Sequence, residues 1–294
     1  MGHVDGKRII VTGSTRGMGR GFATKLAAEG ASVVVNGTNA ALVGEVEAAI
    51  TAAGGTAVGF VGSVADDGVC EEMVTTCVDR FGGIDAVVNN AGIVRDRTLL
   101  NMSPQEFDDV IAVNLRGTWS MSRHAAKAMK ESGGGLLLQV ISGSAFVGSV
   151  GQTNYAASKA GVMGMLYAWD VELARIGVRV NALWPIGETD MTQVVFDMAR
   201  QRAEKDGTVA PAPSDMGFGT PETIAPAVVY LCSDQATQLR SQLVTFNGSK
   251  LAYWQHPREA WIDWRAGWTV DDIAASPVAA AAEKVYRPPM SNPS

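Results

Sequence analysis

Three side chains in the middle of the sequence could together move a proton on and off an alcohol. Tyr155 and Lys159 are four residues apart in a helical pattern, so their tips share one face of a helix. A phenol titrates near pH ~10, and a neighbouring ammonium favours the phenolate, so Lys159 is expected to lower the pKa of Tyr155 toward working pH. Ser142 follows an apolar run and could place its hydroxyl against the same substrate oxygen. The three residues predict acid/base chemistry on an alcohol or a carbonyl.

The elements that must position these side chains alternate between strand and helix. By themselves, a Tyr and a Lys at helical spacing more often form a solvated face, so the interpretation depends on this frame. Apolar runs predict strands over 7–12, 32–36, 56–61, 84–89, 136–141 and 178–183. The intervening patterns predict helices over 18–29, 40–53, 66–81, 104–131 and 153–175. This alternation predicts an α/β fold with a doubly wound parallel sheet.

A glycine-rich turn joins the first predicted strand to the first predicted helix. Gly13, Gly17 and Gly19 stand in the pattern TGxxxGxG, which permits a tight turn and brings a pyrophosphate to the helix N-terminus. We therefore interpret the turn as a dinucleotide site. The second strand ends without an acidic residue to bind a ribose 2′-hydroxyl, and Arg16 and Thr38 could meet a 2′-phosphate. Both could equally be ordinary loop residues; NADP(H) is favoured, and NAD(H) is possible.

Amide side chains mark two further positions. Asn89-Asn90-Ala91-Gly92 ends the fourth strand, where it suits a cofactor or a backbone brace, and a simple turn fits the motif about as well. Asn114 lies in the middle of a predicted helix among apolar neighbours. Because a buried Asn needs partners, Asn114 is either a structural bridge or part of a polar chain that reaches the site.

Taken together, these motifs resemble the short-chain dehydrogenase/reductase family over roughly residues 5 to 250. Ser142 stands thirteen residues before Tyr155, the usual spacing in that family. The resemblance implies a Rossmann-type fold and hydride transfer between a nicotinamide and a ketone or secondary alcohol. It implies that Tyr155 is the acid/base and that Ser142 polarises the substrate oxygen. Lys159 would bind the ribose, and Asn114 would hold a relay water. The implied cofactor-binding residues are Gly13, Ser14, Arg16, Gly17, Met18, Gly19, Thr38, Ser63, Val64, Asn90, Ala91, Gly92, Tyr155, Lys159, Pro185 and Ile186.

The chain departs from the family pattern at two points. Ser63-Val64 replaces the usual Asp-Val that holds the adenine, and Pro185-Ile186 replaces Pro-Gly. These departures would fit a non-catalytic dinucleotide-sensing protein on the same fold. The complete Asn-Ser-Tyr-Lys set instead favours an active enzyme. The stretch over 185–191 is similar in length to that of the hydroxyacyl-CoA dehydrogenase unit of peroxisomal multifunctional enzymes. The sequences of 93–97 and 191–193 also resemble that unit.

The substrate is expected to be a bulky hydrophobic or CoA-linked ketone or secondary alcohol. A 3-oxoacyl-[acyl-carrier-protein] reductase is the alternative. Residues 131–135, just before the fifth strand, lack the basic side chains that an acidic carrier would meet, although Lys127 and Lys130 lie nearby.

The chain is expected to form a catalytic domain over 1–250 and a Trp-rich C-terminal extension over 251–294. Residues 186–220 occupy the place of the family's mobile substrate lid. Clustered tryptophans in the extension are expected to pack against the body or a subunit partner. Thr269-Val270-Asp271-Asp272 predicts a short helix there. The tryptophans are Trp254, Trp261, Trp264 and Trp268.

Composition limits the other classes of protein. A net charge of −6 in 294 residues argues against a nucleic-acid binder, and 47% hydrophobic residues argue against disorder. No apolar run approaches ~18 residues, so no membrane span is expected. The start of the chain fits no signal peptide, and the three cysteines lack metal-ligand spacing, which predicts a cytoplasmic protein without a metal.

The resemblance further implies a homodimer or homotetramer paired through helices near 104–130 and 153–175.

Overall fold

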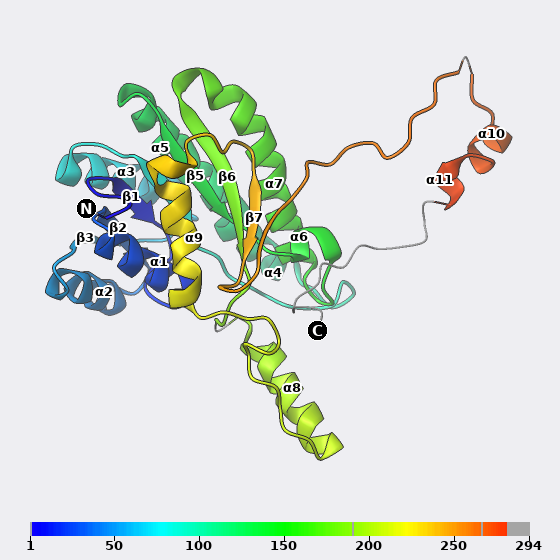
Figure 1. Cartoon of the computed structure of the whole chain (residues 1–294), viewed down its shortest axis with the longest axis horizontal. Coiled ribbons are helices and arrows are strands. Elements are labelled where there is room, and N and C mark those ends of the chain that lie inside the picture. Colours follow the sequence, from blue (N-terminus) through cyan, green and yellow to red (C-terminus); the bar gives the residue numbers. More distant parts are fainter. Residues whose placement is uncertain (1, 190, 266, 281–294) are drawn as a thin grey trace.

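One mixed sheet forms the centre of the molecule. The computed structural model describes residues 2–189, 191–265 and 267–280. Within them, eight strands follow the order β3-β2-β1-β4-β5-β6-β7-β8, parallel except that β8 pairs antiparallel with β7 (Figure 1). The strands are β1 Arg8–Val11, β2 Ser32–Gly37, β3 Thr56–Val61, β4 Ala86–Asn89, β5 Gly135–Val140, β6 Val178–Pro185, β7 Leu243–Phe246 and β8 Leu251–Tyr253. This topology confirms the predicted doubly wound sheet and adds β7 and β8 to the six predicted strands.

Helices cover both faces of the sheet because alternate residues of each buried strand point to opposite sides. In β1, Ile9 and Val11 join the core beneath α1 Gly17–Ala28, α2 Ala40–Ala52 and α9 Pro221–Cys232. Ile10 joins the core on the other face, beneath α3 Asp67–Phe81, α5 Thr118–Glu131 and α7 Thr153–Leu173. The carboxyl ends of the parallel strands therefore share one edge, which carries the glycine turn and Ser142.

The helix predicted over 104–131 is interrupted by a wider turn. It consists of α4 Pro104–Ile111, the π-helical segment η1 Ala112–Gly117, and α5. The Thr118 hydroxyl donates to the Asn114 carbonyl at 2.8 Å, which gives this backbone oxygen a hydrogen-bond partner in the wide turn. Gly117 lets this turn approach the chain after β3, because a Cβ there would lie 2.8 Å from the Val64 carbonyl oxygen. Ser103 opens α4 with a capping box to Glu106.

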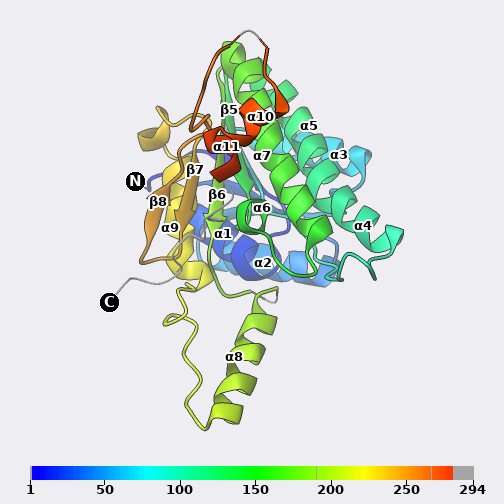
Figure 2. The ribbon, with the colours of Figure 1, turned by 90° about the vertical axis from the view of Figure 1, so that its right-hand side faces the viewer.

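Two segments extend away from the sheet. The helix α8 Gln193–Asp206 projects from the body, and the C-terminal extension runs outward to α10 Val270–Ala274 and α11 Pro277–Ala280 (Figures 1 and 2). The predicted cap at Thr269 is confirmed, since its hydroxyl accepts a hydrogen bond from Asp272 N at 3.1 Å. Three shorter helices complete the described chain: α6 Ser144–Val147, η2 Ala174–Ile176 and η3 Asp234–Ala236.

Candidate active site

The glycine turn has a shape that larger residues cannot adopt. Gly13 and Gly17 have φ of +61° and +51°, in the region that favours glycine. A Cβ on Gly19 would lie 2.2 Å from the Gly13 carbonyl oxygen and 2.5 Å from Asn90 Nδ2. The N-terminus of α1 therefore sits against the ends of β1 and β4, with backbone amides open to an anion at the helix start.

Side chains around the turn brace it from inside the protein. Asn90 Nδ2 donates to the carbonyl oxygens of Thr12 and Gly13, each at 3.0 Å. Thr12 Oγ1 accepts from the amides of Asn90 and Ala91 at the same distance. Ser14 is fully buried, and its hydroxyl donates to the Val11 carbonyl at 2.7 Å. Of the two functions considered for the amide of Asn90, the structure shows the backbone brace.

Arg16 and Thr38 lie on adjoining parts of the same edge. Arg16 is the exposed N-cap residue of α1, and Thr38 is exposed directly after β2. A Cβ on Gly37 would lie 2.5 Å from the Thr15 side chain, so the end of β2 contacts the glycine turn. The segment that carries Thr38 therefore follows directly on a contact with the glycine turn.

The remaining predicted cofactor residues border this edge on both sides. Ser63 is half-buried after β3, where its hydroxyl accepts from Ala65 N at 3.3 Å, and Val64 is buried. Beyond β6, Ile186 is bonded to Phe246 and Gly219 through its backbone, at 3.0 Å each. A Cβ on the following Gly187 would lie 2.1 Å from the Met18 methyl group. Met18 therefore connects the glycine turn to the start of the 186–220 segment.

Asn114 forms a fully buried bridge between three segments. Its Oδ1 accepts from Ile93 N at 2.8 Å, and its Nδ2 donates to the Ile93 carbonyl at 3.0 Å and to Ser158 Oγ at 3.4 Å. Ser158 in turn donates to the Tyr155 carbonyl at 2.7 Å. The bridge fixes the chain after β4 against the turn of α7 that carries Tyr155 and Lys159.

Ser142, Tyr155 and Lys159 meet at the end of β5. The Ser142 hydroxyl lies close to the Tyr155 phenol. Lys159 Nζ donates to the Val140 carbonyl at 2.8 Å and lies 5.7 Å from the centre of the Tyr155 ring. The three side chains that the sequence grouped by spacing are therefore neighbours in the fold.

The electrostatics of this cluster differ from the sequence prediction. Burial raises the pKa of the Tyr155 phenol; the nearby Ser142 hydroxyl acts in the opposite direction, and the Asp96 carboxylate raises the pKa further. Burial also lowers the pKa of Lys159 to about 8. The expected lowering of the Tyr155 pKa by Lys159 is thus wrong for this structure, because desolvation and the Asp96 carboxylate together outweigh the effect of the Ser142 hydroxyl.

A polar chain beside Ser142 was missing from the predicted site. Ser144 N donates to Ser142 Oγ at 3.3 Å, and Ser144 Oγ donates to Gln152 Oε1 at 2.8 Å. Gln152 Nε2 then donates to Asp96 Oδ2 at 3.1 Å. The chain depends on a bridge between Arg97 and Gln152, two segments far apart in sequence, and no local pattern signals such a contact.

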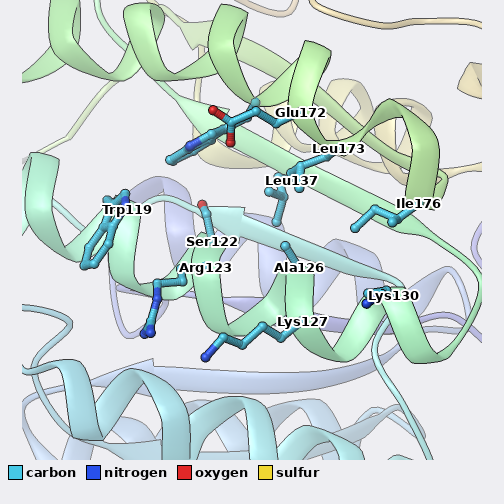
Figure 3. A pocket seen from close by; sticks show the side chains of 11 residues that line it. Trp119, Ser122, Arg123, Ala126, Lys127, Lys130, Leu137, Glu172, Leu173 and Ile176 are labelled. Atoms are coloured by element: carbon cyan, nitrogen blue, oxygen red, sulfur yellow. The ribbon is translucent and has the colours of Figure 1, made fainter.

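A separate groove of about 270 Å³ lies between α5 and the C-terminal part of α7 (Figure 3). Trp119, Arg123 and Lys127 from α5 border it, with Trp169 and Leu173 from α7. Trp169 is fourteen residues from Tyr155 along α7, or about 21 Å at 1.5 Å per residue. The groove is therefore distinct from the Ser142–Tyr155 cluster.

The described ranges hold neither a metal-binding cluster nor a membrane-spanning helix. Residues 2–189, 191–265 and 267–280 contain no group of three or more His, Cys, Asp or Glu side chains that could hold a metal ion. In the same ranges, no helix combines the length and apolar character needed to cross a membrane. Cys70, Cys77 and Cys232 are buried free thiols.

Known proteins resemble this chain over most of its length. Residues 7–200 match the family model described as short chain dehydrogenase. The hydroxyacyl-CoA dehydrogenase ChsB1 of Mycobacterium tuberculosis is 38% identical over 261 residues, covering 84% of this chain and 79% of that protein. The 3-oxoacyl-[acyl-carrier-protein] reductase FabG of Thermotoga maritima is 34% identical over 246 residues, covering 83% and 98%. A crystal structure of a short chain dehydrogenase from Mycobacterium avium has a TM-score of 0.80 at 37% identity and covers 98% of both chains.

Proposed function

Because the chain belongs to the short-chain dehydrogenase/reductase family, an NAD(P)-dependent group acting on CH-OH donors, we propose that it interconverts a bulky hydrophobic or CoA-linked ketone and its secondary alcohol. NADP(H) is the favoured coenzyme. The observation that carries the proposal is the meeting of Ser142, Tyr155 and Lys159 at the edge that also holds the glycine turn. A non-catalytic dinucleotide sensor is disfavoured because this cluster is complete.

The proposed chemistry assigns one task to each side chain. The bound nicotinamide supplies or accepts the hydride. Tyr155 donates the proton to the substrate oxygen in reduction, and its raised pKa keeps the phenol protonated for that step. Ser142, close to Tyr155 at the end of β5, donates a second hydrogen bond to the same oxygen. Lys159 binds the ribose. A water-holding function of Asn114 stays a prediction, since both its amide atoms bond the Ile93 backbone.

Support for NADP(H) comes from the end of β2. Asn36 there is buried and bonded to Gly13 N at 3.1 Å, so the position offers no carboxylate to repel a 2′-phosphate. Replacing Arg16 with Ala should weaken NADPH binding at least about tenfold and NADH binding less than about twofold, because only NADPH carries the additional phosphate. Arg20→Ala is the matched control on the same helix, since Arg20 pairs with Glu45 at 2.9 Å. Equal losses for both coenzymes in Arg16→Ala would contradict the preference.

The proposed substrate class rests on the lid and on one relative. We place the catalytic domain over 1–250 and the lid over 186–220, where α8 exposes Val194, Val195 and Met198. These apolar side chains suit a hydrophobic substrate. ChsB1, by its name, acts on hydroxyacyl-CoA.

The FabG relatives favour the second candidate, a 3-oxoacyl-[acyl-carrier-protein] reductase. A carrier protein would require basic side chains near the mouth of the site. Lys127 and Lys130 precede β5, whereas Ser142 follows it, so the six residues of β5 separate them by about 20 Å. These lysines therefore do not border Ser142 in the same chain, and the CoA-linked or free substrate is preferred.

A steady-state assay with NADPH would test the substrate class. The panel contains acetoacetyl-CoA, a steroid ketone, an aryl ketone and an acyl-carrier-linked 3-oxoacyl substrate. We expect the highest kcat/KM for a CoA-linked or free hydrophobic ketone. A clear preference for the carrier-linked substrate would establish the second candidate instead.

We further propose that the protein is a homodimer or homotetramer paired through α5 and α7. The groove between these helices carries Trp119, which is 42% exposed although its ring is large and apolar, beside Trp169 and Leu173 (Figure 3). Burial in a subunit contact would remove this surface from water. Light scattering should give at least twice the chain mass at micromolar concentration, and a monomer would contradict the proposal.

A further inference from the structure

The first tryptophan of the C-terminal extension packs next to the chain that carries Ser142. Its ring stacks on Phe146 of α6, with 4.7 Å between ring centres and 25° between planes. It also contacts Trp184 of β6 at 5.8 Å. Trp254 Nε1 donates to Thr245 Oγ1 in β7 at 2.8 Å, which fixes the indole over the sheet. Trp254 thus joins α6 to two strands.

The helix α6 has little internal means of holding its position. It has four residues, starts two residues after Ser142, and contains no buried residue. A single helical turn is unstable without tertiary contacts, because forming the first turn of a helix is unfavourable in free energy. Phe146 is its large apolar side chain, 38% exposed even with Trp254 stacked on it. The stacking is therefore a principal packing contact of α6.

Trp184 supports the other end of the same segment. A Cβ on Gly143 would lie 2.2 Å from the Trp184 ring, so the backbone directly after Ser142 lies against that indole. Trp254 contacts Trp184 and Phe146 together. The aromatic cluster Phe146–Trp184–Trp254 therefore supports the chain from Gly143 to Phe146, while the polar chain through Ser144 and Gln152 holds it on the side of α7.

We propose that Trp254 is a positioning residue for Ser142: by clamping α6, it holds the Ser142 hydroxyl where it meets Tyr155 and the substrate oxygen. The catalytic part of this inference rests on the proposed function; the clamp itself does not. The extension would accordingly contribute to the active site through its first residues. Trp264, further along the extension, is 89% exposed.

Three variants separate positioning from general stability. Trp254→Ala removes the clamp, Trp254→Phe keeps a stacking ring, and Trp264→Ala is the matched control. In Trp254→Ala, hydrogen exchange of the peptide over 142–152 should accelerate, and kcat should fall between about tenfold and 100-fold, the scale of a misplaced reacting group. The Kd for NADPH should stay within about twofold, because the glycine turn lies on other strands. Trp254→Phe should recover most of kcat, and Trp264→Ala should match the parent protein.

Two results would overturn the proposal. Unchanged exchange over 142–152 in Trp254→Ala would show that the tryptophan does not hold α6. Faster exchange with unchanged kcat would show that α6 does not position Ser142. If the parent protein reduces no ketone in the panel, the proposed function fails, and the exchange difference between Trp254→Ala and Trp264→Ala alone then decides whether the clamp exists.

Discussion

The two halves of the candidate active site are built in different ways. On the coenzyme side, polar groups are bonded to one another inside the body: Asn90 holds Thr12 and Gly13, and Ser14 holds Val11. On the substrate side, α6 has no buried residue and α8 projects from the sheet (Figures 1 and 2). The first half depends on fixed backbone, and the second depends on a small number of aromatic contacts.

This difference indicates where sequence change is tolerated. A turn whose atoms are already in close contact rejects even one added methyl group. Elements held by few contacts can shift and accommodate substrates of different shape, which is the usual property of loops carried on a rigid scaffold. Substitutions in the coenzyme half should therefore affect folding and coenzyme binding together, whereas substitutions in the substrate half should affect KM or kcat alone.

The largest effect on stability is expected at Gly19. Gly19→Ala places a methyl group against the Gly13 carbonyl and Asn90, and overpacking of this kind costs about 3 kcal/mol. We expect the free energy of unfolding to fall by that amount and NADPH binding to weaken at least about tenfold. In the control Gly44→Ala, the methyl group on α2 meets nothing within 4 Å. Denaturant titration measures the free energy of unfolding, and NADPH fluorescence measures coenzyme affinity. If Gly19→Ala and Gly44→Ala gave similar values of both, the proposed difference between the two halves would be contradicted.

A smaller effect is expected at Lys159, which lies between the halves. Its pKa is lowered to about 8 in the folded protein, so between pH 8 and 10.5 the unfolded chain binds the proton that the folded protein has released. Stability relative to Lys159→Met should therefore rise with pH across this window, by at most about 3 kcal/mol. The exposed Lys205→Met variant should follow the parent protein at each pH. A relative stability that stays flat or falls across the window contradicts the buried-ammonium interpretation.

The smallest effect is expected at the base of α8. Phe196 is 7% exposed and contacts Phe218 edge-on, with ring centres 5.1 Å apart. Such a pair contributes about 0.5–1.5 kcal/mol beyond area burial, so Phe196→Ala should raise KM for the ketone about threefold to tenfold. Gln201→Ala, at an exposed position of the same helix, is the control. Loss of NADPH affinity in Phe196→Ala would show that α8 serves the coenzyme half instead.

The coenzyme half was also the more predictable from sequence. Gly13, Gly17 and Gly19 occur within one turn, and the strands before and after it show clear periodicity, so local patterns suffice. The spacing of Tyr155 and Lys159 likewise follows from helix geometry. Their placement beside Ser142 agrees with the structure because α7 begins close to the end of β5.

The substrate half depends on contacts that local patterns do not record. The π-helical turn around Asn114 interrupts a helix whose periodicity looks continuous. Asp96 and Gln152 meet only through tertiary folding. The direction of the Tyr155 pKa shift depends on how deeply the phenol is buried, and spacing to Lys159 cannot reveal that. Of the tryptophans in the extension, Trp254 packs on the body as expected, whereas Trp261 and Trp268 pack on each other.

The most direct test compares two identical substitutions on α7. Tyr155→Phe removes the hydroxyl that we assign to proton transfer, and Tyr167→Phe removes one from a ring that packs on His256, 5.2 Å away. With a ketone substrate and saturating NADPH, kcat should fall about 10²- to 10⁴-fold in Tyr155→Phe and stay unchanged in Tyr167→Phe, while both variants bind NADPH like the parent protein. A Tyr155→Phe enzyme that retains its kcat would contradict the assignment of the proton transfer to Tyr155.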